Sequence, residues 1–172
     1  VAVSTEAMPI NVGYIASYCL KKFGDKIEIS LFKYISELED ALINSPPDIL
    51  GLSNYCWSQN VSYEMFKLLK EKNPKALTIW GGPNFPIDLP SQKIFMKEFD
   101  AVDVYIPIDG EIGFSNVVEE TLELDSPEQI QEEILDSPID GCITRNRIGE
   151  IQFSIPTIRM KHLDEIPSPY TT

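Results

Sequence analysis

Two apolar runs that end in small or polar residues constrain the fold of this chain most. They are residues 47–53 (PDILGLS) and residues 77–84 (LTIWGGPN). A buried strand of a parallel sheet is apolar along its length, and ligands bind such sheets at the carboxyl ends of the strands. The two runs therefore predict parallel strands with a binding site where they end.

Strand and helix patterns alternate over residues 1–125, which we expect to form the main domain. Helical spacing of apolar residues lies between the predicted strands, and this alternation is typical of α/β proteins. The fold class that it predicts is a Rossmann-like, flavodoxin-like, doubly wound sheet of five parallel strands. The predicted strands are residues 1–4, 26–34, 49–53, 76–80 and 102–108.

The pattern changes in residues 126–172, which we expect to form a small C-terminal appendage. A short acidic helix starts at residues 126–129, and two strands, 142–145 and 150–153, are joined by a turn at Gly149. The tail at residues 163–170 contains two prolines among polar residues, so it is expected to be an irregular linker.

Composition and charge exclude several classes of function. The chain is 43% hydrophobic, carries a formal charge of −13 and has scattered lysines, which disfavours contact with nucleic-acid phosphates. No apolar run approaches the ~20 residues that span a bilayer, and no signal peptide is evident, so we expect a cytoplasmic protein that does not bind membranes. The three cysteines are widely spaced and are expected to be reduced.

The loop after residues 76–80 is a candidate binding loop. Gly81 and Gly82 would let a ligand approach the backbone, and Pro83 would stiffen the loop beside them. A plain tight turn explains the same residues equally well.

The loop after residues 49–53 offers polar and aromatic groups close together. Ser53, Tyr55 and Trp57 suit a large, flat and partly polar cofactor, although the two rings could instead cover the edge of the sheet. A third turn contains Gly110 and Glu111, where the carboxylate could act as a helix-dipole partner or bind a ligand hydroxyl.

Catalytic groups are sparse in this sequence. The single histidine, His162, lies in the tail, and no metal-ligand motif, GxGxxG loop or GxxxxGK[ST] loop occurs. We therefore assign no catalytic and no metal-binding residue, and expect the chain by itself not to be catalytic.

A series of motifs runs through nearly the whole sequence. Their order is residues 8–16 (MPINVGYIA), 47–53, 73–74 (NP), 80–84 (WGGPN), 109–111 (DGE), 141–145 (GCITR) and 163–170 (LDEIPSPY). Together they resemble the amino-terminal cobalamin-binding domain of radical S-adenosylmethionine (SAM) proteins and the stretch that joins it to the radical SAM barrel.

This resemblance implies cobalamin as the cofactor, bound over the carboxyl ends of the strands. It also implies that the 4Fe-4S cluster and SAM belong to the barrel of the same parent chain, because the CxxxCxxC motif is not in this sequence. We read the chain as an excised domain whose partner is that barrel. The residues that the resemblance places at the cofactor are Tyr14, Ser53, Tyr55, Trp57, Gly81, Gly82, Pro83, Asn84, Gly110 and Glu111.

Three functions remain open from the sequence. The first is the cobalamin-binding module of a radical SAM enzyme, such as a cobalamin-dependent methyltransferase. The second is a cobalamin-free interaction or substrate-gating module of such a protein, which is kept open because Asn84 and Ile112 depart from the family pattern. The third is a flavodoxin-like binder of flavin mononucleotide, which uses the same strand ends.

Overall fold

The computed structural model describes residues 9–124, 134–146, 148–154, 156–157 and 159–170. Within these residues two helices come first, helices and strands then alternate up to α5, and a hairpin follows. The elements are α1 (Ile10–Phe23), α2 (Ile35–Asn44), β1 (Ile49–Ser53), α3 (Gln59–Lys72), β2 (Leu77–Gly81), α4 (Leu89–Glu98), β3 (Val104–Ile106), α5 (Gly110–Leu122), β4 (Ile143–Arg145) and β5 (Ile151–Phe153).

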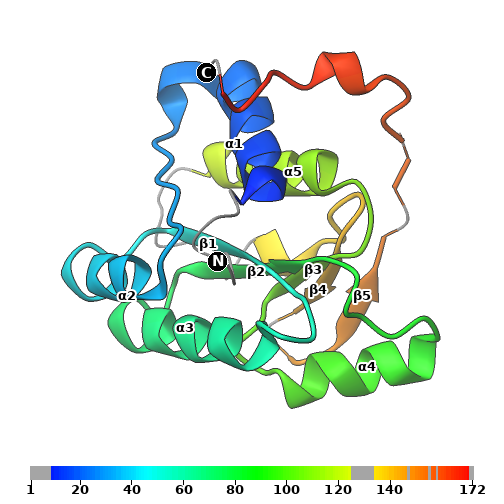
Figure 1. The fold of residues 1–172 in the computed structure, drawn as a ribbon. Helices are drawn as coiled ribbons and strands as arrows, with labels where there is room; N and C mark the ends of the chain where they lie inside the picture. Colours follow the sequence, from blue (N-terminus) through cyan, green and yellow to red (C-terminus); the bar gives the residue numbers. More distant parts are fainter. Residues whose placement is uncertain (1–8, 125–133, 147, 155, 158, 171–172) are drawn as a thin grey trace.

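The strands form one mixed sheet in the order β1-β2-β3-β4-β5. β1, β2 and β3 are parallel, whereas β4 and β5 are antiparallel to their neighbours. Helices α1 and α5 cover one face of the sheet, and α2, α3 and α4 lie on the other (Figure 1). The α/β, Rossmann-like class predicted from the sequence is confirmed. Within the described residues the five-stranded sheet is mixed, with three parallel strands and an antiparallel hairpin where five parallel strands were predicted.

The predicted strand at residues 26–34 is not a strand. A 3₁₀ turn, Gly24–Lys26, ends α1, and residues 27–32 continue without regular structure. The alternation that suggested a strand is still visible, because Ile27 and Ile29 are half-buried and Glu28 and Ser30 are exposed. Alternation sets the two faces of a segment, but a strand also needs a hydrogen-bonded neighbour. The predicted strand at residues 1–4 lies outside the described residues.

The predicted hairpin is confirmed, but its place in the fold differs from the expectation. β4 pairs with β3 through Val104 opposite Thr144, so the hairpin continues the main sheet. Cys142 and Ile143 are buried on opposite faces, because Cys142 packs in the cluster of Leu77 and Ile79 and Ile143 packs in the cluster of Trp80. The acidic helix predicted from residue 126 lies outside the described residues, and the division of the chain at residue 125 stays a prediction.

The core is built on β2, the middle one of the three parallel strands. Leu77 and Ile79 point to one face of the sheet and pack with β3 and α5, whereas Trp80 points to the opposite face. Trp80 is fully buried and contacts the rings of Tyr63, Phe66, Phe95 and Phe99. This aromatic cluster joins α3 and α4 to the sheet.

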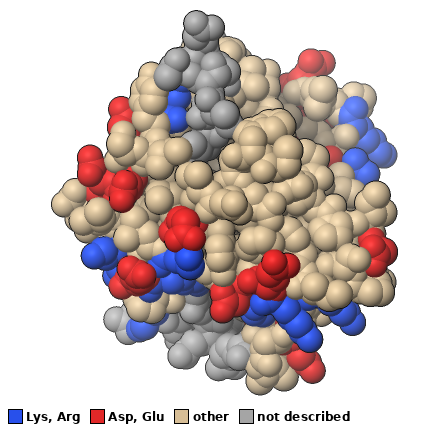
Figure 2. Space-filling model, turned by 60° about the horizontal axis from the view of Figure 1, so that its bottom comes forward, with Lys and Arg blue, Asp and Glu red and all other residues tan. Residues whose placement is uncertain are grey.

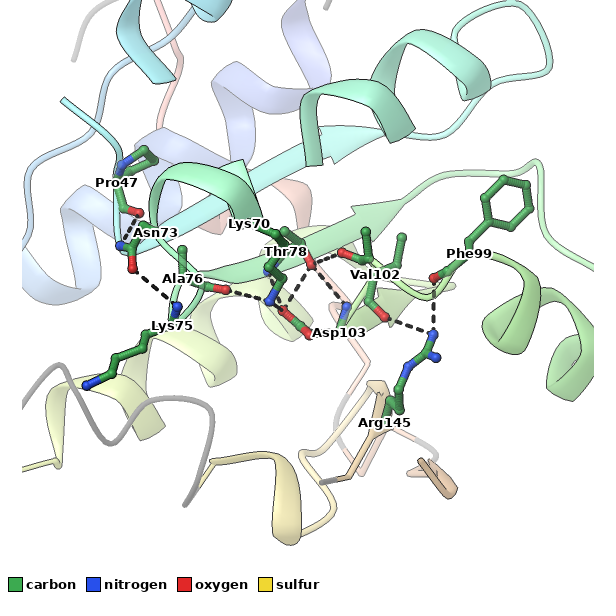
Figure 3. Close-up of polar contacts among 11 residues, drawn as sticks. Pro47, Lys70, Asn73, Lys75, Ala76, Thr78, Phe99, Val102, Asp103 and Arg145 are labelled. Carbon is green, nitrogen blue, oxygen red and sulfur yellow. Dashed lines mark hydrogen bonds and ion pairs between the residues drawn. The ribbon is translucent and has the colours of Figure 1, made fainter. Parts of the chain in front are cut away.

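Charged side chains hold the amino ends of the strands together (Figure 3). Lys70 on α3 donates to Asp103 at 2.5 Å, and Asp103 also accepts hydrogen bonds from the backbone N–H and hydroxyl of Thr78 at 2.9 and 3.0 Å. Arg145 on β4 donates to the carbonyls of Phe99 and Val102 at 3.1 and 3.3 Å. These contacts join α3, β2, α4 and the hairpin at one edge of the sheet.

The face of the molecule in Figure 2 shows acidic and basic side chains interspersed around an uncharged centre. Lysines and arginines on this face lie beside aspartates and glutamates, so its described part presents no continuous basic patch for a polyanion. Among the described residues, no helix combines the length and the apolar character needed to cross a bilayer.

We expect Asp103→Ala to lower the free energy of unfolding by about 3 kcal/mol, because it leaves the mostly buried Lys70 ammonium without its carboxylate. The matched control is Glu64→Ala, which breaks the exposed pair between Glu64 and Lys67 and should cost under ~0.5 kcal/mol. Urea denaturation of both variants measures the difference. Equal losses would contradict a structural role for the Asp103 cluster.

Candidate functional site

The carboxyl ends of the three parallel strands lie level with one another. In the sheet register Ser53 is opposite Gly81, and Gly81 is opposite Ile106. The loops that follow β1, β2 and β3 therefore emerge at the same edge of the sheet. In α/β folds this edge is where ligands bind.

A cavity of about 930 Å³ opens at this edge and extends along β1 toward α2. Its outer part is lined by the loops after the three strands and by the start of α5. Its inner part is lined mainly by apolar side chains, among them Ile27, Ile29, Leu38 and Leu42. The cavity thus has a polar mouth and an apolar interior.

The structure brings seven of the ten predicted cofactor residues to this cavity. They are Ser53, Tyr55, Gly81, Gly82, Pro83, Gly110 and Glu111. Of the other three, Trp57 lies at the rim, Asn84 lines a separate shallow surface hollow, and Tyr14 on α1 lines neither. Their assignment to cobalamin stays a prediction.

Two stacked aromatic rings form one rim of the mouth. The rings of Tyr55 and Trp57 lie 4.9 Å apart at an interplanar angle of 4°, and Trp57 remains 62% exposed. Asn11 at the start of α1 donates a hydrogen bond to the Tyr55 hydroxyl at 2.9 Å. The rim therefore offers a flat apolar surface whose position is set by α1.

Sequence reasoning missed the buried polar network that holds the first two loops together. Asn54 has no exposed surface, and its side chain donates to the Asn84 carbonyl at 2.7 Å and to the Tyr105 hydroxyl at 3.3 Å. Asn84 in turn donates to the side chains of Asn54 and Gln59 at 3.2 and 2.7 Å. The available signal was an amide residue placed directly after a buried strand, where a polar group must find a partner.

The backbone of this network requires a glycine at position 82. Its φ is +128°, and a Cβ there would lie 2.7 Å from the Asn54 carbonyl oxygen. The carbonyl of Gly82 also accepts a hydrogen bond from the Tyr105 hydroxyl at 2.8 Å. Gly81 differs, because a Cβ there would lie 3.4 Å from the nearest atom, the Ile106 carbonyl oxygen. Of the two glycines, Gly81 is the one at which a Cβ would make only ordinary van der Waals contact.

The third loop carries an unusual backbone conformation at Asp109. This residue has a φ of +48°, and its carboxylate forms an ion pair with Arg159 from the C-terminal tail. Asp109 lies directly before α5, so this contact brings the tail to the edge of the site. Glu111 follows in the first turn of α5, where the helix dipole favours a carboxylate.

The cysteines divide into two buried thiols and one exposed thiol. Burial raises the pKa values of Cys19 and Cys142 to about 12, so both stay protonated near neutral pH. Cys56 is exposed and lies between Tyr55 and Trp57 in sequence. Among the described residues, no group of three His, Cys, Asp or Glu side chains is placed to bind a metal.

We expect Gly82→Ala to destabilise the domain by about 2 kcal/mol, because the new methyl group collides with the Asn54 carbonyl and the φ value strains any L-residue. The matched variant Gly81→Ala should cost less than ~1 kcal/mol. Thermal unfolding measures both. A Gly82→Ala protein as stable as the Gly81→Ala protein would show that the loop is not held as described.

Comparison with known proteins was made on sequence and on structure. No known protein-family profile matches the chain. It is 30% identical over 136 residues to the cobalamin-dependent radical SAM methyltransferase TokK from Streptomyces tokunonensis, covering 79% of this chain and 18% of TokK. It is 31% identical over 124 residues to the 2-(S-pantetheinyl)-carbapenam-3-carboxylate methyltransferase from Streptantibioticus cattleyicolor, covering 72% of this chain and 16% of that enzyme.

The solved structure of the cobalamin-dependent SAM radical enzyme OxsB, with aqua-cobalamin and SAM bound, has a similar fold. It superposes with a TM-score of 0.63 at 19% sequence identity and covers 94% of this chain and 21% of OxsB. The chain thus spans about a fifth of the length of these proteins. By sequence, the chain is similar to a domain-sized part of cobalamin-dependent radical SAM methyltransferases.

Proposed function

We propose that this chain is the cobalamin-binding module of a radical SAM methyltransferase. The observation that carries the proposal is the cavity mouth at the carboxyl ends of three parallel strands, in a chain related to cobalamin-dependent enzymes. Seven of the ten residues that the resemblance places at the cofactor line this mouth or the cavity behind it.

The residues at the mouth fit the chemistry of cobalamin. Gly81 has no side chain that would exclude a ligand, and Ser53 carries a hydroxyl. The stacked rings of Tyr55 and Trp57 form a flat apolar surface. Bound cobalamin would supply the methyl-carrying cobalt, and this chain would bind and orient the cofactor. In the proposed arrangement Tyr55 and Trp57 hold the rim of the corrin, while Ser53 and Gly81 line the pocket for its nucleotide tail.

We further propose that the partner of this module is the radical SAM barrel of the same parent protein, which holds SAM and the 4Fe-4S cluster. The C-terminal tail supports this arrangement because several contacts fix it to the domain, and one of them, at Asp109, lies at the edge of the site. The Thr157 backbone donates to Asp140 at 2.9 Å, Arg159 pairs with Asp109, and Lys21 on α1 donates to the Glu165 carbonyl at 2.7 Å. The tail includes one 3₁₀ turn, Leu163–Glu165, so the irregular linker expected from the sequence contains a short regular element.

Titration of the protein with hydroxocobalamin, followed by visible absorbance and calorimetry, tests the proposal. We expect saturable binding that Tyr55→Leu weakens by about tenfold, or ~1.4 kcal/mol, because an aromatic contact with the corrin is lost. Phe153→Leu is the matched control. Phe153 is a half-buried ring on β5, the strand at the other edge of the sheet from β1, so its replacement should leave the affinity for cobalamin unchanged.

A second readout uses the exposed Cys56 at the rim. Bound cobalamin should slow its alkylation by iodoacetamide, while buried Cys19 and Cys142 stay unreactive with or without the cofactor. A folded protein that binds no cobalamin would overturn the proposal. Binding of flavin mononucleotide, followed by its fluorescence, would favour the flavodoxin-like alternative. A protein that binds neither ligand would favour an interaction module.

A further inference from the structure

The C-terminal tail, residues 159–170, lies against the first helix. Lys21 on α1 donates to the Glu165 carbonyl at 2.7 Å, and a Cβ at Gly13 would lie 3.0 Å from the Pro169 Cβ. The tail therefore runs antiparallel to α1, and its red end lies beside that helix in Figure 1. Glycine inside a helix is unfavourable relative to alanine, so the close packing of Pro169 gives a physical reason for glycine at position 13.

An ion pair joins the same tail to the third loop of the site. The guanidinium of Arg159 donates from Nε and from one terminal nitrogen to the two carboxylate oxygens of Asp109. Such a bidentate pair is geometrically specific, because the planar guanidinium matches the planar carboxylate. The Asp109 side chain is only 18% exposed, so solvent screens this pair less than it screens a fully exposed one.

Asp109 begins α5 in a conformation that its own side chain does not support. Its φ is +48°, and its carbonyl accepts hydrogen bonds from the N–H groups of Ile112 and Gly113 at 3.1 and 3.0 Å. An aspartate before a helix usually has an extended backbone, and its carboxylate accepts a hydrogen bond from the first turn. Here the carboxylate makes no such bond to α5 and binds Arg159 instead. The contact with the tail therefore opposes the strain of a left-handed residue that carries a side chain.

The residues beside this contact belong to the mouth of the cavity. Asp109, Gly110 and Glu111 all line the cavity. Gly110 also lies close to α1, because a Cβ there would lie 3.1 Å from Cδ1 of Ile15. The third loop is thus held between α1 and the tail, and the tail is itself held along α1.

We propose that Arg159 is a positioning residue for the mouth of the cavity. Its ion pair keeps Asp109 in the left-handed conformation from which α5 starts, and so sets the positions of Gly110 and Glu111. The effect on cofactor affinity rests on the proposed function, whereas the effect on the loop does not. Because coupling between two sites is reciprocal, a cofactor bound at the mouth also stabilises the docked tail.

Residue-resolved amide hydrogen exchange of the full chain, without any cofactor, tests the positioning role. We expect Arg159→Gln to speed the exchange of the Ile112 and Gly113 amides about fivefold, because the turn that begins α5 opens more often. Lys161→Gln is the matched control. It removes a positive charge from an exposed position of the same tail, and should leave both amides unchanged. Equal exchange in the wild-type and Arg159→Gln proteins would overturn the proposal.

A glycine at position 109 separates positioning from a general role of Arg159 in stability. Glycine adopts a positive φ without strain, so the Asp109→Gly protein has no need of the ion pair at this residue. In that background we expect Arg159→Gln to have no further effect on the Ile112 and Gly113 amides. If Arg159→Gln speeds their exchange as much as in the wild-type background, the proposal fails, because Arg159 then acts through the tail alone.

Titration with hydroxocobalamin measures the consequence for the mouth. We expect Arg159→Gln to weaken binding about fivefold, Arg159→Lys to weaken it less, and Lys161→Gln to leave it unchanged. If the wild-type and Arg159→Gln proteins bind cobalamin equally well, the coupling is overturned and the proposed function stands. If the folded wild-type protein binds no cobalamin, the proposed function fails, and the exchange measurements still decide whether Arg159 positions the loop.

Discussion

The parallel hydrogen-bond ladder that joins β1, β2 and β3 is the constraint on which the rest of this structure depends. It places Ser53, Gly81 and Ile106 at the same level, so three loops distant in sequence emerge together. Asn54 then holds the first two loops to each other with both its backbone and its side chain. The mouth of the cavity is a consequence of this pairing.

The amino and carboxyl ends of the parallel strands differ in how their side chains are partnered. At the amino ends of the parallel strands, the charged side chains of Asp103 and Arg145 form hydrogen bonds within the protein. At the carboxyl ends a flat pair of rings is left at the surface and a glycine without a close steric neighbour lies at the mouth. Saturated polar contacts stabilise a fold, whereas an open mouth with apolar walls is what a ligand requires.

Several features of the site followed from local sequence pattern. The apolar runs that end in small and polar residues correctly located β1 and β2, and the turn at Gly149 correctly located the hairpin. At residues 26–34, the alternation of apolar and polar residues predicted a strand that the structure does not contain. This alternation sets which side chains are half-buried, but strand pairing depends on a neighbour that local sequence does not specify. The same limit explains why the hairpin was expected as an appendage and proved to extend the sheet beside β3.

By itself the sequence determined the positions of β1 and β2 and the resemblance to cobalamin-dependent radical SAM proteins, because periodicity and motif order are properties of neighbouring residues. Only the tertiary structure decided the roles of individual residues at the site. Gly81 and Gly82 are identical in sequence, yet one borders the cavity with room for a Cβ and the other is required by the Asn54 carbonyl. That difference arises from atoms 28 residues away in the chain, between Asn54 and Gly82, which the fold alone brings within 2.7 Å of a Cβ at Gly82.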